Sequence, residues 1–242
     1  MEIHKPKAAH NWREFLIEIG TIICGILIAV GLEQAVQALE WRHKIELAQE
    51  AMASELGDDN GPQVYQRAIL DACLQSQLDR IRGAVEDGAD RATVWRAVDG
   101  YKIQFLTYDS LALNAANAAG VTAHMSRDKL QTWIDLYSGI TSLDTAHANE
   151  THDLAILRSI RSVGGPLTQA EGDRVLQAVE ALRNDEARIM TGVRWFLPHL
   201  AHAHIPLGEA HVRRLTTWAR HRYDACLKDL PHDWSGPKDD WF

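Results

Sequence analysis

Hydrophobic residues are concentrated in one uninterrupted run near the amino terminus. No charged residue occurs between Glu18 and Glu33, and residues 19–32 read IGTIICGILIAVGL. With its apolar flanks, the run covers residues 15–36, about 22 residues, and a helix that spans a bilayer needs about 17–25. The pattern therefore predicts a transmembrane helix at residues 15–36.

Two other interpretations of this run stay open. Lys5, Lys7 and Arg13 form a basic leader, and residues 36–38 (Val-Gln-Ala) resemble the small-residue cleavage site of a signal peptide. A core helix of a soluble protein is the other alternative, because 14 apolar residues can also be buried by protein.

The charges on either side of the run indicate its orientation. Lys5, Lys7 and Arg13 precede it, whereas Arg42 and Lys44 follow it among acidic residues. The positive-inside bias favours a cytoplasmic amino terminus, which places the remaining chain outside the cytoplasm.

One face of the predicted membrane helix carries small and acidic residues. At 100° per residue, five positions fall within one arc of about 120°. They are Glu18, Thr21, Gly25, Ala29 and Glu33. Small residues spaced by four allow two helices to approach closely in lipid, so this face predicts helix packing. Alternatively, the two glutamates only mark the water interfaces.

The same segment resembles the anchor of a known protein family. Glu18-Ile19, Ile22-Ile23 and residues 25–29 (GILIA), followed by Trp41-Arg42, look like the anchor of a family of uncharacterised bacterial single-pass inner-membrane proteins. The resemblance covers about 30 residues and implies an extracytoplasmic helical domain. It implies no reaction and no catalytic residues.

Helical periodicity continues through the rest of the chain, and no stretch alternates as a strand would. Gly57 and residues 58–62 predict a helix stop and a turn. Ser126 and Thr168 are expected to begin two long helices, with Glu171 completing a capping box. The other helices are expected at residues 33–56, 63–86, 91–98, 110–119 and 207–228.

Two hydrophobic stripes with spacings of three and four indicate a helical bundle. The first runs from Trp133 to Leu157 and the second from Val175 to Leu200. Three polar residues interrupt these stripes: His147, Glu150 and Glu186. They predict a metal or ligand site inside the bundle, a buried polar group that fixes helix register together with Arg161 or Arg188, or a solvated edge of the stripes.

Other residues with possible chemistry are weaker candidates. Four histidines surround the turn before the last helix, which favours a solvated turn over a metal site. They are His199, His202, His204 and His211. The tryptophans at 95, 133, 195 and 218 are expected in the core.

Three cysteines are present, and two of them lie outside the predicted membrane helix. An extracytoplasmic domain would allow Cys73 and Cys226 to form a disulfide that ties the second helix to the last one, and two buried thiols are the alternative. Cys24 behaves as a small apolar residue of the membrane segment.

Composition excludes some classes of function. The net charge is −8, from 25 basic and 33 acidic residues, so the chain lacks the basic surface of a nucleic-acid binder. No phosphate-binding loop, zinc-protease motif or nucleophile elbow is present. We therefore expect neither enzyme activity nor a cofactor.

These observations predict an all-α protein of the bacterial inner membrane. Residues 1–14 are expected to form a cytoplasmic tail, 15–36 a transmembrane helix, 37–230 a periplasmic helical bundle continuous with that helix, and 231–242 a tail. The expected function is a membrane-anchored interaction or scaffold module that pairs with itself or with a membrane-protein partner. The alternative is an extracytoplasmic ligand-sensing or accessory subunit of a signalling or transport complex.

Overall fold

The chain is helical through most of the part that the structure describes. The computed structural model describes residues 12–104, 106–160 and 166–223, and these ranges contain no strand. The predicted all-α fold is therefore confirmed. The elements are α1 (Trp12–Ser54), a π-helical turn η1 (Glu55–Asn60), α2 (Gly61–Glu86), α3 (Arg91–Gly100), α4 (Leu111–Ala118), a 3-10 turn η2 (Val121–His124), α5 (Arg127–Ser159), α6 (Gln169–His202) and α7 (Glu209–Arg222).

The chain divides into two compact units, Met1–Leu47 and Ala48–Phe242. The described part of the first unit is the amino-terminal stretch of α1, and most of its large apolar side chains are exposed and none is buried. The second unit holds the hydrophobic core. Of the boundaries expected from the sequence, those after residues 14 and 36 fall inside α1, and that after 230 lies outside the described residues.

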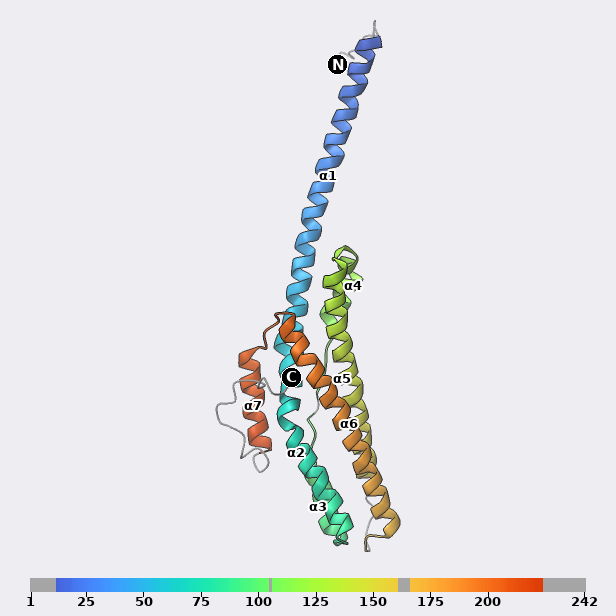
Figure 1. The fold of residues 1–242 in the computed structure, drawn as a ribbon, viewed down its shortest axis with the longest axis vertical. Coiled ribbons are helices and arrows are strands. Elements are labelled where there is room, and N and C mark those ends of the chain that lie inside the picture. Colours follow the sequence, from blue (N-terminus) through green and yellow to red (C-terminus); the bar gives the residue numbers. More distant parts are fainter. Residues whose placement is uncertain (1–11, 105, 161–165, 224–242) are drawn as a thin grey trace, which may run out of the picture. The chain divides into compact units, whose positions relative to one another are not determined.

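Three long helices build the core of the second unit. α5 and α6 lie side by side along their lengths, α2 packs against α6, and α7 packs against α2 (Figure 1). Both hydrophobic stripes seen in the sequence face this core. The buried positions are Trp133, Leu136, Ile140, Leu143, Leu154 and Leu157 on α5, and Val175, Val179, Leu182, Ile189, Val193, Phe196 and Leu200 on α6.

The prediction of a turn at residues 57–62 is wrong. The backbone continues from α1 through a π-helical turn directly into α2, and Pro62 occupies the first turn of α2. Proline is tolerated there because the first amides of a helix have no intrahelical acceptor. Gly57 serves close packing: a Cβ at this position would lie 2.5 Å from the Pro206 carbonyl oxygen, and the Gly208 amide donates to the Gly57 carbonyl at 2.8 Å.

The segment between α3 and α4 is held by side-chain amides of the first helices. The Asn60 side chain donates to the Asp109 carbonyl oxygen at 2.9 Å and accepts from the Asp109 amide at 3.0 Å. Gln63 makes the same pair of bonds with Thr107, at 3.0 and 3.2 Å. These bonds satisfy backbone groups that lack a regular partner, so they hold Thr107 and Asp109 in place against η1 and α2.

The two expected helix starts differ in their capping. The capping box of Thr168 and Glu171 is present: each side chain accepts a hydrogen bond from the backbone amide of the other residue. Ser126 occupies the N-cap position of α5, but its side chain makes no capping bond.

Two of the four tryptophans expected in the core are not there. Trp95 and Trp133 are buried, whereas Trp195 is 37% exposed and Trp218 is 43% exposed. Trp195 lies between Val193 and Phe196, two positions of the hydrophobic stripe of α6, so the helical period directs its side chain away from the core. Its indole instead stacks on His199, with ring centroids 4.0 Å apart.

Candidate functional site

The three polar residues that interrupt the hydrophobic stripes lie together in the core. His147 and Glu150 belong to α5 and Glu186 belongs to α6, and all three are buried. Their helical positions explain this placement, because each continues a row of core-facing apolar residues. A polar group can stay in such a place only if it has partners.

The principal partner is Arg67 on α2, which sequence reasoning did not identify. Its Nη2 donates to Oε1 of Glu150 and, at 2.8 Å, to Oε1 of Glu186, and all three side chains are inaccessible to solvent. Tyr101 also donates its hydroxyl to Oε1 of Glu186 at 3.3 Å. One arginine thus joins α2, α5 and α6; we call Arg67, Tyr101, His147, Glu150 and Glu186 the buried cluster.

His147 links the cluster to the segment that follows α3. Its Nε2 lies 3.1 Å from the Leu106 amide, from which it accepts, and its Nδ1 lies 2.9 Å from Oε2 of Glu150. This pattern assigns the proton of the neutral imidazole to Nδ1, because Nε2 must carry a lone pair. His147 therefore orients Glu150 from the side opposite to Arg67.

The two buried carboxyl groups have different ionisation behaviour. Burial favours the protonated form of Glu150, but the Arg67 charge and the hydrogen bond from His147 outweigh it, and the pKa of Glu150 lies below its ordinary value. For Glu186, burial dominates, and the nearby Glu150 adds to it against the opposing effect of Arg67. Together they raise the pKa of Glu186 to about 8. At neutral pH the cluster is therefore one arginine, one carboxylate and one largely protonated glutamic acid.

Arginine occupies the position that a metal ion would need in this cluster. Both carboxyl groups direct an oxygen to the Arg67 guanidinium, and His147 is committed to Glu150 and the Leu106 amide. No group of three or more His, Cys, Asp or Glu side chains suited to a metal occurs among the described residues. The arrangement instead matches a buried ionic cluster that fixes how three helices meet.

The cluster also leaves polar atoms unsatisfied. Nε and Nη1 of Arg67 and Oε2 of Glu186 are buried without a hydrogen-bond partner among the described residues. Unpaired buried groups cost about 1–3 kcal/mol each, and more when charged, so the cluster is a poor source of stability.

The arginines that the sequence suggested as partners lie elsewhere. Arg161 lies outside the described residues, and Arg188 is an exposed residue of α6 that lines a groove. The signal for Arg67 was present in the sequence. Arg67 lies one turn before Leu70 and extends the stripe of Leu70, Leu74 and Leu78 on α2.

The five residues of the predicted membrane-helix face all lie in α1, and none is buried. A Cβ at Gly25 would have no atom within 4 Å, so none of the residues that the structure describes occupies the space beside it. The Thr21 hydroxyl donates to the Ile17 carbonyl oxygen at 2.8 Å, which leaves no unsatisfied donor on this face. The five residues are Glu18, Thr21, Gly25, Ala29 and Glu33.

The histidines around the last turn do not converge on one point. His199, His202 and His204 are exposed and His211 is half-buried. Nδ1 of His199 lies 2.6 Å from the Trp195 carbonyl oxygen and donates to it, which ties this ring to its own helix.

The predicted disulfide remains a prediction. Cys24 is a free thiol, and Cys73 lies in a disulfide, on the buried side of α2. Cys226 lies outside the described residues, so its pairing with Cys73 is not described.

Comparison with known proteins identifies no relative. No protein-family model, no curated protein and no solved structure matches the chain.

Proposed function

We propose that this protein is a single-pass protein of the bacterial inner membrane, with its helical domain in the periplasm. It serves as an interaction or scaffold module, which assembles through α1 with a second copy or with another membrane protein. The amino terminus is cytoplasmic.

The exposed apolar surface of α1 carries this proposal. The helix is long and apolar enough to cross a membrane, its most apolar window has a mean hydropathy of 2.5, and none of that window is buried. Large side chains such as Ile26 and Leu27 are 56% and 65% exposed. A continuous apolar surface of this length is unfavourable in water and favourable in hydrocarbon.

The polar ends of the segment agree with a bilayer of ordinary thickness. Glu18 and Glu33 are separated by about 22 Å along the helix, against a hydrocarbon core of about 30 Å. Both carboxylates then lie a few ångströms inside the apolar layer, which favours contact with a polar partner or with the headgroups. Trp12 and Trp41 flank the segment, as aromatic residues do at membrane interfaces.

Membrane insertion and orientation are tested together in cells. We expect the full chain to remain in the membrane after alkaline carbonate extraction. In a Cys24→Ser background, Ser76→Cys should react with a membrane-impermeant maleimide in intact spheroplasts, whereas Lys7→Cys should react only after lysis. Release by carbonate contradicts the anchor, and the reverse labelling pattern contradicts the orientation.

Assembly through α1 is tested with two matched glycine variants. Gly25 lies on the predicted packing face and Gly31 lies on another side of the helix, and a Cβ at either position meets no atom within 4 Å. We expect Gly25→Ile to weaken self-association or partner binding of the full chain in detergent at least tenfold, and Gly31→Ile to leave it unchanged. Glu18→Gln combined with Glu33→Gln should act in the same direction as Gly25→Ile.

The readout is sedimentation velocity of the purified full chain, together with identification of any protein that co-purifies from the native membrane. A strict monomer with no co-purifying protein contradicts the assembly proposal. Loss of assembly with Gly31→Ile alone contradicts the choice of face.

A further inference from the structure

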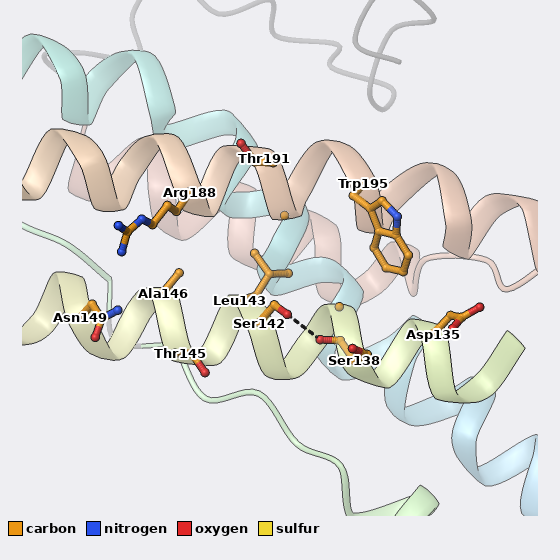
Figure 2. Close-up of a pocket in the computed structure, with 12 residues that line it drawn as sticks. Asp135, Ser138, Ser142, Leu143, Thr145, Ala146, Asn149, Arg188, Thr191 and Trp195 are labelled. Atoms are coloured by element: carbon orange, nitrogen blue, oxygen red, sulfur yellow. Dashed lines mark hydrogen bonds between the residues drawn. The ribbon is translucent and has the colours of Figure 1, made fainter. Parts of the chain in front are cut away.

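Two grooves follow one another along the outer side of the α5–α6 pair. The first has a volume of about 490 Å³ and lies between the middle of α5 and the carboxyl-terminal half of α6. The second, about 370 Å³, lies between the end of α5 and the start of α6. Figure 2 shows the first groove, with Arg188 and Asn149 toward one end and Trp195 and Asp135 toward the other. We call this side of α5 and α6 the hairpin face.

Small residues line the floor of the hairpin face. A Cβ at Gly139 would lie 2.4 Å from Cζ3 of Trp195, and a Cβ at Gly192 would lie 2.6 Å from Cδ2 of Leu143. These glycines allow α5 and α6 to approach closely. The short side chains of Ser142, Ala146 and Ala181 leave the grooves above them open. Such a surface admits another helix at close range.

Exposed apolar side chains also gather on the hairpin face. Among the described residues of the second unit, five large hydrophobic side chains are exposed: Leu111, Ile134, Ile156, Trp195 and Trp218. Ile156 and Trp195 line the grooves, and Ile134 lies one turn before Ser138 on the same row of α5. Exposed apolar groups grouped on one face mark an interaction surface.

The charged residues that line the grooves are divided by helix. α5 contributes only acidic groups, Asp135 and Asp153, whereas α6 contributes only basic groups, Arg174 and Arg188. Arg188 also attracts the neighbouring Asp185 within its own helix. Arg188 is exposed and forms no hydrogen bond or ion pair with the residues that the structure describes.

This division of charge makes the face complementary to itself. A two-fold axis parallel to the helices places α5 of one copy over α6 of the other and keeps both copies pointing in the same direction. The acidic edge of each copy then meets the basic edge of the other, with Asp153 of one copy near the level of Arg188 of the second. Complementary edges of this kind set partner choice and orientation between packed helices.

We propose that the hairpin face is the interface with a second copy of this chain, so that α5 and α6 of two copies form an intermolecular four-helix bundle. The face extends about 37 Å, since about 25 residues of α5 separate Asp135 from Ile160. With helices 8–10 Å apart, it is about 20 Å wide and buries roughly 700 Å² per copy, close to a standard dimer interface. This interface deepens the self-assembly proposed for α1, but it rests on different residues.

Cysteine cross-linking of the full chain in detergent or lipid nanodiscs tests the geometry. The axis runs along the groove, so Ser142 of one copy lies near Ser142 of the other. In a Cys24→Ser background, we expect Ser142→Cys to form a covalent dimer on mild oxidation at least tenfold faster than Ser76→Cys, an exposed position on α2. Equal rates for the two variants overturn the proposal.

A pair of charge insertions tests the energy of the interface. Ile156 and Leu111 are two exposed aliphatic residues of the second unit, but only Ile156 lies on the hairpin face. We expect Ile156→Arg to raise the dimer dissociation constant of the full chain at least tenfold and Leu111→Arg to leave it unchanged. Equal effects, with both variants folded by circular dichroism, overturn the proposal.

The two proposed interfaces can fail separately. If Gly25→Ile weakens assembly while Ser142→Cys does not cross-link, the α1 interface stands and the hairpin face is refuted. If Ser142→Cys cross-links and Ile156→Arg weakens the dimer while Gly25→Ile has no effect, the hairpin face stands and the α1 proposal is refuted. A monomer by sedimentation that also fails to cross-link refutes both as sites of self-assembly.

Discussion

At the scale of single residues, the buried cluster explains more of this core than any other feature. Arg67 neutralises Glu150, while Glu186 holds a proton because burial disfavours its charge. The cluster therefore couples the stability of the bundle to pH through carboxyl groups that have no contact with water.

The pH dependence of stability has a definite sign. The pKa of Glu186 is about 8 in the folded chain, and an exposed glutamate has a pKa near 4.3. Between these pH values the folded state binds a proton that the unfolded state has released. The contribution of Glu186 is thus present at low pH and lost as pH rises toward 8, by up to about 1.4 kcal/mol per pH unit. Asp185, whose pKa burial and Asp153 raise to about 6, adds a contribution of the same sign at lower pH.

We predict that Glu186→Gln removes most of this dependence. Glutamine resembles the protonated acid and keeps an oxygen that can accept from Arg67 and Tyr101, so stability should change much less between pH 5 and pH 8 than in the parent chain. The change that remains comes mainly from Asp185. The measurement is urea unfolding of the full chain in detergent at both pH values. Glu180→Gln, an exposed position of α6, should keep the slope of the parent chain; a Glu186→Gln variant with the parental slope would contradict the assignment.

A second residue-scale prediction concerns Arg67. Arg67→Met alone should lower the free energy of unfolding by about 3–5 kcal/mol, because it leaves the Glu150 charge buried without its partner. Adding Glu150→Met and Glu186→Met should recover most of this loss, since a packed apolar group replaces the whole charged set. The measurement is the unfolding midpoint of each variant, and a triple variant no more stable than Arg67→Met would contradict this account.

At the scale of elements, sequence periodicity predicted the long helices and their buried faces but missed how they join. The stripes on α5 and α6 are buried as expected, because a period of 3.6 residues determines which side chains share a face. Gly57 and Pro62 are strong local signals for a turn, yet close packing against Pro206 and the first-turn position of Pro62 gave them other roles. The polar residues that interrupt the hydrophobic stripes were identified from the sequence. Arg67 was not, because its partners come from helices distant in sequence.

We predict opposite effects of alanine at two helical glycines. Gly57→Ala should destabilise the chain by about 1–3 kcal/mol, because its Cβ would overlap the Pro206 carbonyl oxygen. Gly83→Ala in α2, where a Cβ meets no atom within 4 Å, should stabilise by about 0.5–1 kcal/mol. Thermal unfolding followed by circular dichroism measures both effects, and a neutral Gly57→Ala would show that the contact can relax.

The two N-caps give a further matched comparison. Thr168→Ala should cost about 0.5–2 kcal/mol, because it removes the side-chain oxygen that accepts from the Glu171 amide. Ser126→Ala should cost less, because the Ser126 side chain makes no capping bond. The measurement is the free energy of unfolding of each variant. Equal losses for Thr168→Ala and Ser126→Ala would contradict the difference in capping.

At the scale of the whole molecule, the two units differ in where they place apolar surface. The second unit buries its large apolar side chains with few exceptions, whereas no residue of the run in α1 is buried. The sequence predicted this contrast because one uncharged stretch is sufficient to identify it. The hairpin face could not be predicted, since it depends on which sides of α5 and α6 remain uncovered after folding.

We predict that a charge in the middle of the exposed run disrupts membrane retention. Ile26→Lys should disfavour insertion by about 2.5–3.5 kcal/mol, because lysine then lies near the centre of the bilayer. Leu47→Lys, at an exposed position of α1 outside residues 15–36, should have little effect. The fraction of each variant recovered with membranes after carbonate extraction is the measurement, and equal recovery would argue against the proposed span.

The protonated state of Glu186 also has a calorimetric consequence. At pH 7 the folded chain carries most of a proton on this residue that the unfolded chain gives up, so unfolding releases close to one proton to the buffer. The apparent enthalpy of unfolding should therefore depend on the ionisation heat of the buffer, and it should be lower in imidazole, whose protonation is strongly exothermic, than in phosphate.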